Sequence, residues 1–328
     1  MDNPRNAQLR EQLLIRKNRL ETVIEKSKSD ESLVNLMHEV DVALEKMDKG
    51  TYGLCEICYE PIEQERLVVD PLIRNCIDHL TPAEQHALEH DLDLAYQVQN
   101  TLLPKQNLTF GSWTTAYHYE AAGPVSGDYC DLIAPYREDE SMLFLLGDVT
   151  GKGVAASLLM AHLHAIFRSL MRAKLTVSQL VEQANRLFCE GTMSTHFATL
   201  VCGMANTSGE VEICNAGHCF PFLVQGKRIE RIQSTGLALG MFCTGQFSIK
   251  KVKLGPGDSL FLYSDGLSEA RNKSNIQYGE ERLAALISKE RAASPQELIN
   301  SCLQDLANFQ SGAPKTDDLT MIVIRRVG

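Results

Sequence analysis

The segment MLFLLGDVTGKG, from Met142 to Gly153, constrains the fold of this chain more than any other stretch. Its apolar run ends before Asp148, and a turn containing glycine then leads into a second apolar segment that begins at Val154. This pattern predicts a buried strand, a tight loop and a long apolar helix. A carboxylate at the end of a buried strand, next to backbone that glycine leaves open to close approach, suits a hard cation.

A phosphate-binding loop is the alternative for the same glycines. Such a P-loop has the pattern G-x-x-x-x-G-K-[ST]. Here only three residues separate Gly147 from Gly151, and Gly153 rather than Ser or Thr follows Lys152. The spacing therefore excludes a P-loop and favours Asp148 as a metal ligand.

Composition narrows the class of protein. A chain of 328 residues can hold one large domain and a smaller module. Its formal net charge of −10 argues against direct nucleic-acid binding, which needs a basic surface. The sequence has no secretory signal and no apolar run long enough to span a membrane. Because its ten cysteines occur in such a chain, we expect reduced thiols and a cytoplasmic location.

The N-terminal region predicts a helical hairpin. Residues 6 to 48 carry apolar side chains at helical spacing, with a break at 27–30. We expect Ser29 or Asp30 to cap the second helix, and Lys49-Gly50 to end it.

Two pairs of metal-binding side chains follow the hairpin, with the spacing C-x2-C, seventeen residues, C-x2-H. They are Cys55, Cys58, Cys76 and His79. Scattered core cysteines are the alternative, but the paired spacing is typical of a tetrahedral zinc site. A closed set of four ligands predicts one structural Zn²⁺.

The run ALEKMDKGTYGLCEICYEPIEQERLVVDPLIRNC resembles the DksA/TraR-type zinc finger proteins, in which a helical hairpin precedes such a knuckle. The resemblance covers residues 30 to 80 and implies a module over residues 1–80. His79 stands where many relatives have cysteine. The hairpin tip, Lys26 to Glu31, lacks the paired aspartates with which some relatives reach into RNA polymerase, so a polymerase contact is the weaker expectation.

Residues 81–104 predict a linker helix. Thr81 and Glu84 form a capping box, and Pro82 occupies the first helical position. Apolar side chains then recur every three or four residues, at Leu88, Leu92, Ala95, Val98 and Leu102. This seam suits either a surface helix of the next domain or a two-stranded homodimer interface.

Residues 105–328 alternate predicted strands and helices. Strands are expected at 112–120, 129–134, from 142, and at 197–205, 210–214, 220–224, 227–233, 246–253, 258–263 and 319–326. Helices are expected at 154–172, 177–189, 279–290 and 295–309. Many strands with paired helices indicate two sheets covered by helices, an α+β layered domain.

Four acidic positions in this domain share one pattern, an aspartate where a strand meets a turn. They are Asp128, Asp148, Asp265 and the pair Asp317-Asp318. A single Asp-Gly is usually only a turn. Four such carboxylates at strand ends instead predict one cluster of ligands for Mg²⁺ or Mn²⁺, which could activate a water for attack on phosphorus.

The domain also contains, in order, GPVSGDYCD, LLGDVTGKGVAASLLMA, FATL, NAGHCFPFL, GLALGM, YSDGLSEA and TDDLTMIVI. These motifs resemble the SpoIIE/RsbU-like branch of the metal-dependent type 2C protein phosphatases, from residue 92 to the C-terminus. The resemblance implies an αββα sandwich. It also implies removal of phosphate from serine or threonine of proteins, often anti-sigma-factor antagonists of the STAS type.

The resemblance implies roles for the aspartates, which are then both metal ligands and catalytic residues. Asp148 and the backbone carbonyl of Val149 would bridge two metal ions. Asp265 and Asp317 would complete the shell of one ion, and Asp128 would serve the other.

Two further positions follow from the same family pattern. Asp318 is expected to orient its neighbour rather than bind metal. Thr150 stands near the position at which type 2C relatives with Asp-Gly-His have a histidine proposed as the general acid. We therefore assign no protein acid here. No arginine is evident for the substrate phosphate, and the metal ions are expected to carry most of its recognition.

Two functions are consistent with these features. The first is a Mg²⁺/Mn²⁺-dependent phosphoserine/phosphothreonine protein phosphatase, controlled by the zinc module through the linker helix. The second is a DksA/TraR-like transcription regulator that uses the phosphatase domain as a scaffold or sensor. A degenerate scaffold should have lost carboxylates, and all of them are present, so the enzyme is favoured.

Overall fold

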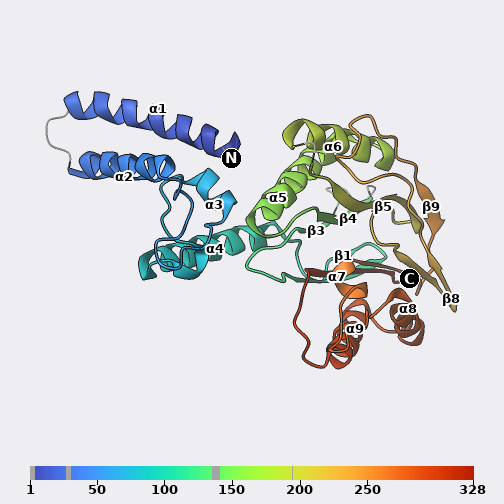
Figure 1. Cartoon of the computed structure of the whole chain (residues 1–328). Coiled ribbons are helices and arrows are strands. Elements are labelled where there is room, and N and C mark those ends of the chain that lie inside the picture. Colours follow the sequence, from blue (N-terminus) through green and yellow to red (C-terminus); the bar gives the residue numbers. More distant parts are fainter. Residues whose placement is uncertain (1–3, 27–30, 135–140, 194) are drawn as a thin grey trace. The chain divides into compact units, whose positions relative to one another are not determined.

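Figure 1 shows the computed structural model of the chain, which describes residues 4–26, 31–134, 141–193 and 195–328. The chain divides into two compact units, Met1–Asp91 and Leu92–Gly328, which we describe separately. The boundary between them falls inside helix α4, Pro82–Leu102.

The first unit is built on the predicted helical hairpin, formed by α1 (Pro4–Lys26) and α2 (Glu31–Asp48). Its core includes Leu13 and Val40, which are almost fully buried. Gly50, at a φ of 70°, follows the end of α2 as predicted. The expected N-caps Ser29 and Asp30 lie outside the described residues. A short helix α3 (Gln64–Val69) and a 3-10 turn (Ile77–His79), neither of which we predicted, continue the unit.

Helix α4 begins with the expected capping box. The Thr81 N–H donates to Glu84 Oε2 at 2.8 Å, and the Glu84 N–H donates to Thr81 Oγ1 at 3.3 Å. Near the other end of the helix, the buried Gln99 amide donates to the Ser126 carbonyl at 2.7 Å and accepts from the Ser126 N–H at 3.0 Å. These two bonds fix the end of α4 to the loop that precedes Asp128.

The second unit contains two antiparallel sheets in the described part of the chain. The five-stranded sheet has the order β3-β4-β5-β6-β9, and the six-stranded sheet has the order β1-β2-β11-β10-β7-β8. The strands are β1 (Thr109–Phe110), β2 (Trp113–Glu120), β3 (Asp128–Ile133), β4 (Met142–Val149), β5 (Ala198–Ala205), β6 (Glu210–Ala216), β7 (Phe222–Gln225), β8 (Arg228–Arg231), β9 (Lys250–Lys253), β10 (Ser259–Tyr263) and β11 (Leu319–Arg326).

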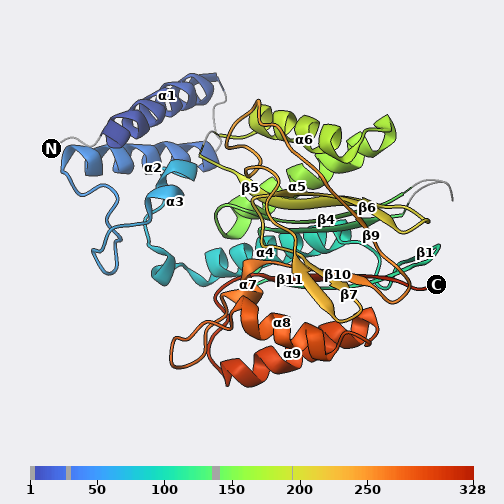
Figure 2. The same cartoon turned by 90° about the vertical axis from the view of Figure 1, so that its right-hand side faces the viewer.

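Helices cover the outer face of each sheet, as Figure 2 shows. α5 (Gly153–Leu170) and α6 (Val177–Gly191) pack on the five-stranded sheet, while α8 (Glu280–Lys289) and α9 (Pro295–Gln310) pack on the other. A third apolar cluster lies between the two sheets. The predicted αββα sandwich is therefore confirmed.

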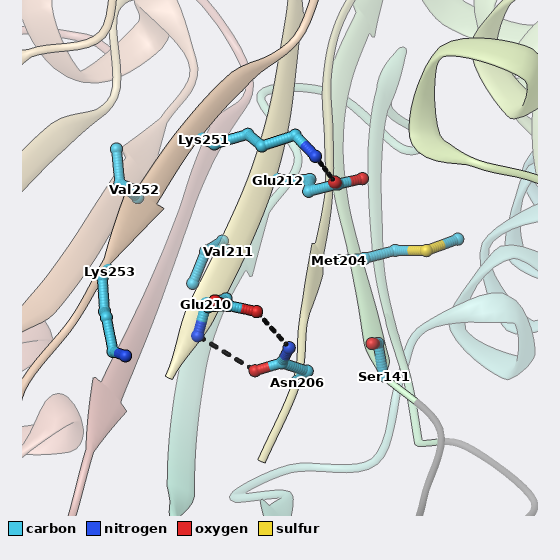
Figure 3. Close-up of a pocket in the computed structure, with 9 residues that line it drawn as sticks. All are labelled: Ser141, Met204, Asn206, Glu210, Val211, Glu212, Lys251, Val252 and Lys253. Atoms are coloured by element: carbon cyan, nitrogen blue, oxygen red, sulfur yellow. Dashed lines mark hydrogen bonds and ion pairs between the residues drawn. The ribbon is translucent and has the colours of Figure 1, made fainter. Parts of the chain in front are cut away.

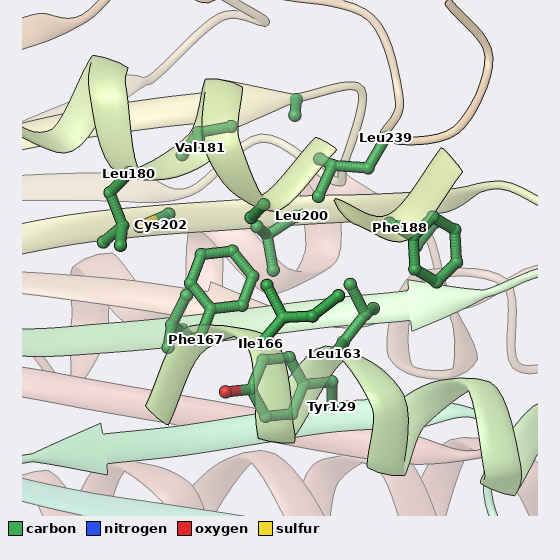
Figure 4. Packing of buried hydrophobic residues seen from close by; sticks show 14 of the residues in the cluster. Tyr129, Leu163, Ile166, Phe167, Leu180, Val181, Phe188, Leu200, Cys202 and Leu239 are labelled. Atoms are coloured by element: carbon green, nitrogen blue, oxygen red, sulfur yellow. The ribbon is translucent and has the colours of Figure 1, made fainter. Parts of the chain in front are cut away.

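Strand β4 shows why the central apolar run has no polar alternation. Leu143 and Leu145 belong to the cluster under α5 and α6, part of which Figure 4 shows, whereas Phe144 and Leu146 belong to the cluster between the sheets. Both faces of the strand are covered, so successive side chains are all apolar. Gly203 on the neighbouring strand leaves the space for Phe144, since a Cβ there would lie 2.2 Å from the Phe144 ring.

Most strand and helix predictions agree with the structure within a few residues, but the predicted strand 246–253 is shorter. Only Lys250–Lys253 forms β9. Phe247 is buried instead, and its carbonyl accepts a hydrogen bond of 2.7 Å from Ser178 Oγ on α6. Packing against a helix therefore replaces strand pairing in this segment. The short β1 and α7 (Asp265–Ser268) were not predicted.

Helix α5 is the one helix among the described residues that is long and apolar enough to cross a membrane. Leu163, Ile166 and Phe167 on this helix are buried in the cluster over the five-stranded sheet (Figure 4). This packing identifies α5 as a core helix, and a membrane span is not indicated.

Candidate active site

The predicted aspartates meet at one end of the two sheets. Asp128 and Asp148 are directly opposite each other in the antiparallel register of β3 and β4. Asp265 follows β10, and Asp317 lies two residues before β11 begins. Strands β10 and β11 are antiparallel neighbours, so these two ends lie side by side. The topology therefore collects carboxylates that lie far apart in the sequence.

Hydrogen bonds join the two sheets at this end. Thr320 Oγ1, on β11, donates to Asp128 Oδ2 at 2.5 Å. The Asp318 carboxylate accepts from the Ala122 N–H at 2.7 Å and from the Gly127 N–H at 2.8 Å. Both oxygens of Asp318 thus hold the loop that carries Asp128, rather than the neighbouring Asp317 that we expected Asp318 to orient.

The carboxylates make ionisation of one another difficult. Burial raises the pKa of Asp148 to about 7, and the charges of Asp265 and Asp317 add to the effect. Burial also raises the pKa of Asp128 well above its ordinary value, and the facing Asp148 raises it further. Likewise, the pKa of Asp265 is raised by burial and then by Asp317. Cations at this end of the sheets would remove that cost.

The donor set fits Mg²⁺ or Mn²⁺, because carboxylates and the Val149 carbonyl supply only oxygen ligands. Backbone approaches closely here: a Cβ at Gly127 would lie 3.2 Å from the Val149 oxygen and 3.5 Å from Asp148 Oδ1. The carboxylate oxygens do not form a cluster of three within 4.8 Å in the described part of the chain. Three carboxylates that bind one ion would have to lie closer together, because the ligand oxygens of a single Mg²⁺ lie within about 4.2 Å of one another.

The four predicted zinc ligands also come together, in the first unit. The ligand atoms of Cys55, Cys58, Cys76 and His79 all lie within 4.8 Å of one another. The Cys58 and Cys76 sulfurs are 3.7 Å apart, close to the ~3.8 Å expected of two sulfurs that are each ~2.3 Å from one tetrahedral Zn²⁺.

The pKa values of two of these thiols are also shifted, and a cation between the thiols would stabilise their thiolate forms. Burial raises the pKa of Cys76 to about 11, and the neighbouring Cys55 and Cys58 add to this rise. Burial acts in the same direction on Cys55, yet N–H groups of Cys58 and Cys76 outweigh it and lower the Cys55 pKa to about 6. The residues present therefore fit the predicted structural zinc.

Lys152 is a site residue to which sequence reasoning gave no role. Its Nζ lies 2.9 Å from the Thr316 carbonyl and 3.1 Å from Asp317 Oδ2. Burial and neighbouring carboxylates raise the pKa values of Asp148 and Asp265, and the Lys152 charge opposes that rise. Its position in the turn after Asp148 was the only sequence signal, since the contact with Asp317 joins segments 165 residues apart.

The hydroxyl of Thr150 binds the adjacent loop. Thr150 Oγ1 donates to the Phe197 carbonyl at 3.1 Å and accepts from the Phe197 N–H at 3.1 Å. His218 is buried beside β5, where its Nδ1 lies 2.8 Å from Thr199 Oγ1. Burial lowers the pKa of His218 to about 4. Neither side chain is arranged as an evident proton donor.

A separate pocket, shown in Figure 3, contains none of these carboxylates. Its polar side chains largely bind one another: Lys251 pairs with Glu212 at 2.6 Å, and Asn206 donates to Glu210 at 3.1 Å. It therefore offers few unsatisfied groups for a ligand, and the carboxylate end of the sheets remains the candidate active site.

Residues 138–327, more than half of the chain, match the family described as Stage II sporulation protein E (SpoIIE). The chain is 29% identical over 270 residues to Protein IcfG of Synechocystis sp., covering 72% of this chain and 41% of that protein. It is 26% identical over 250 residues to Phosphoserine phosphatase RsbU of Bacillus subtilis, covering 74% and 72%. The chain thus spans less than half the length of IcfG.

The fold is also similar to that of a solved structure, the SiaA-PP2C domain of Pseudomonas aeruginosa. The TM-score is 0.64 at 17% identity, and the match covers 75% of this chain and 99% of that domain. At such identity the similarity concerns the fold alone, and it agrees with the αββα layers. Because the family model matches more than half of the chain and includes Asp148, Asp265 and Asp317, the chain belongs to the SpoIIE family.

Proposed function

We propose that this protein is a Mg²⁺/Mn²⁺-dependent phosphatase that removes phosphate from phosphoserine or phosphothreonine of a regulatory protein. The observation that carries the proposal is the set of aspartates collected from both sheets, whose pKa values are raised by burial and by one another. The relative named Phosphoserine phosphatase RsbU supports the same activity.

Each aspartate has a role in this proposal. Asp148 and the Val149 carbonyl would hold both ions, Asp265 and Asp317 would hold one of them, and Asp128 would hold the other. Bound ions would neutralise phosphate charge and lower the pKa of an attacking water. We assign no protein general acid, because the Thr150 hydroxyl is bonded to Phe197.

The substrate is proposed to be a phosphorylated regulatory protein, such as a STAS-type anti-sigma-factor antagonist, in the cytoplasm. The support is the similarity to RsbU and the family match. We propose neither a membrane nor a nucleic-acid partner.

The N-terminal part is proposed to be a DksA/TraR-like zinc module over residues 1–80 that regulates the phosphatase domain, residues 105–328, through the helix at 81–104. The closely grouped zinc ligands support this module. Exposed apolar side chains on α4, among them Tyr96 and Val98, support a homodimer through that helix. A transcription regulator with contact to RNA polymerase is the alternative, which the complete carboxylate set makes less favoured.

The test of the activity is hydrolysis of p-nitrophenyl phosphate by the full chain with Mn²⁺, with and without a chelator. We expect turnover that needs Mn²⁺ and disappears in Asp148→Asn. Chelator-resistant turnover would contradict the proposal. Pull-down with Asp148→Asn, followed by mapping of phosphorylated sites in the captured proteins, would then identify the substrate.

A further inference from the structure

We propose that Lys152 binds the phosphate of the substrate at the edge of the carboxylate cluster. This inference rests on the proposed phosphatase function and deepens it, because it assigns part of phosphate recognition to a protein side chain. Sequence reasoning had left most of that recognition to the metal ions.

The place of Lys152 in the fold is the first argument. It is the N-cap residue of α5, with extended backbone (φ −138°, ψ 165°), and no side chain caps the helix there. The turn that presents it has Gly151 and Gly153 at φ of 104° and 68°, conformations that favour glycine. A lysine at a helix N-terminus is unfavourable for the helix dipole, so helix stability does not explain this residue.

The start of α5 lies beside the metal-ligand loop. A Cβ at Gly127 would lie 3.2 Å from the Ala156 Cβ in the first turn of α5, and 3.2 Å from the Val149 oxygen. The uncapped N–H groups of a helix N-terminus favour an anion. Lys152, the N-cap residue of α5, adds a positive charge next to this N-terminus, so two features favour a phosphate there.

The charge pattern is the third argument. In the described part of the chain, no arginine lies within 4.0 Å of the cluster aspartates, and Lys152, bound to Asp317 at 3.1 Å, is the lysine paired with one of them. Lys315 comes from the same loop as Asp317 but pairs with Glu120, at 3.3 Å. A cation at the edge of the carboxylates adds to the attraction that bound metal ions would exert on a phosphate dianion, and Lys152 is placed to provide it.

A purely structural tether explains Lys152 less well. The side chains of Lys152 and Asp317 are 71% and 47% exposed. An ion pair with this much exposure contributes little to the stability of the fold. An ammonium group has three donors, and the contacts with Thr316 and Asp317 use two of them. The third donor and the flexible side chain leave Lys152 free to hydrogen-bond a phosphate oxygen.

The test compares Lys152→Gln, Lys152→Arg and the matched control Lys315→Gln, all in the full chain with saturating Mn²⁺. Glutamine keeps a donor for the Thr316 carbonyl but removes the charge. We expect Lys152→Gln to raise KM for p-nitrophenyl phosphate and Ki for inorganic phosphate about tenfold, the scale of one charge-assisted hydrogen bond. kcat should change much less, Lys152→Arg should restore most of the binding, and Lys315→Gln should leave both constants unchanged.

Calorimetry of inorganic phosphate binding to the Mn²⁺-loaded protein gives a readout independent of turnover, and it should show the same loss of affinity in Lys152→Gln. An unchanged phosphate affinity, or an equal effect of Lys315→Gln, would overturn the inference. If the wild-type protein does not hydrolyse p-nitrophenyl phosphate at all, the proposed function fails, while the phosphate calorimetry still decides the role of Lys152.

Discussion

The two candidate metal sites are assembled in opposite ways. The zinc ligands lie within 25 residues of sequence, from Cys55 to His79, and their atoms converge within 4.8 Å. The carboxylates of the candidate active site extend from Asp128 to Asp317, and β-sheet topology brings them together. We therefore expect a zinc ion to stabilise the smaller unit, whereas the large core of the second unit positions the carboxylates. Loss of each metal should accordingly have different consequences.

The largest expected effect is loss of activity without loss of fold. Asp148→Asn or Asp265→Asn removes a charged ligand, so turnover should fall by more than about 100-fold, since even outer-shell partners of metal ligands cost about 10–100-fold. Circular dichroism should show an intact fold, because each substitution relieves repulsion among the carboxylates. Near-wild-type turnover of either variant would refute the two-metal assignment.

The converse result is expected at the zinc site. The double substitution Cys55→Ser with Cys58→Ser should release the single Zn²⁺ and unfold the first unit locally, because folding of such a knuckle depends on its metal. Metal analysis and limited proteolysis would measure both effects, and the thermal transition of the second unit should stay unchanged. Zinc retained at full stoichiometry would place the metal elsewhere.

A smaller effect tests how the sheets support the ligands. Thr320→Val removes the hydroxyl that donates to Asp128 across the sheets, and Mn²⁺ affinity should weaken by about tenfold. Thr320→Ser keeps the hydroxyl and serves as the control. Equal Mn²⁺ affinity in Thr320→Val and the wild-type protein, measured by calorimetry, would show that Asp128 is held by other contacts.

The pH dependence of Mn²⁺ binding should separate the sites further. In the metal-free fold the pKa of Asp148 is about 7, above the ordinary 3.8. The folded chain then holds a proton that the unfolded chain releases, so stability falls as the pH rises from about 4 to about 7. Mn²⁺ competes with that proton, so the Mn²⁺-induced rise in Tm should be larger at pH 8 than at pH 5. An equal rise at both pH values would contradict the raised pKa.

The smallest expected effect on catalysis concerns the helix that connects the two units. Val98 on α4 is 62% exposed. Val98→Asp should give a monomer by light scattering and should leave the zinc content unchanged. Any change in turnover should then come from the altered packing of α4. Gln97→Asp, also exposed, is the matched control. A variant that keeps the wild-type mass would show that α4 is not the dimer interface.

Local patterns in the sequence predicted the zinc ligands, the capping box of Thr81 and Glu84 and the order of strands and helices, because spacing and turn residues determine these features. The aspartates were found because each follows or precedes a buried strand. The supporting contacts could not be predicted, since Lys152–Asp317 and Thr320–Asp128 each join positions more than 160 residues apart. The shortened β9 was missed for the same reason, because Phe247 packs against a distant helix.

The paired hydrogen bonds between Gln99 and Ser126 bear on how such chains can be recombined. They fix the rotation of α4 about its own axis, because they tie Gln99 to Ser126, which lies only two residues before Asp128 in the sequence. Deleting one residue upstream would rotate everything fused to that helix by about 100° relative to the catalytic domain. Removing seven residues would restore the phase to within about 20°. Chimeras that place a different N-terminal module before Leu92 should therefore work only at junctions spaced by about seven residues.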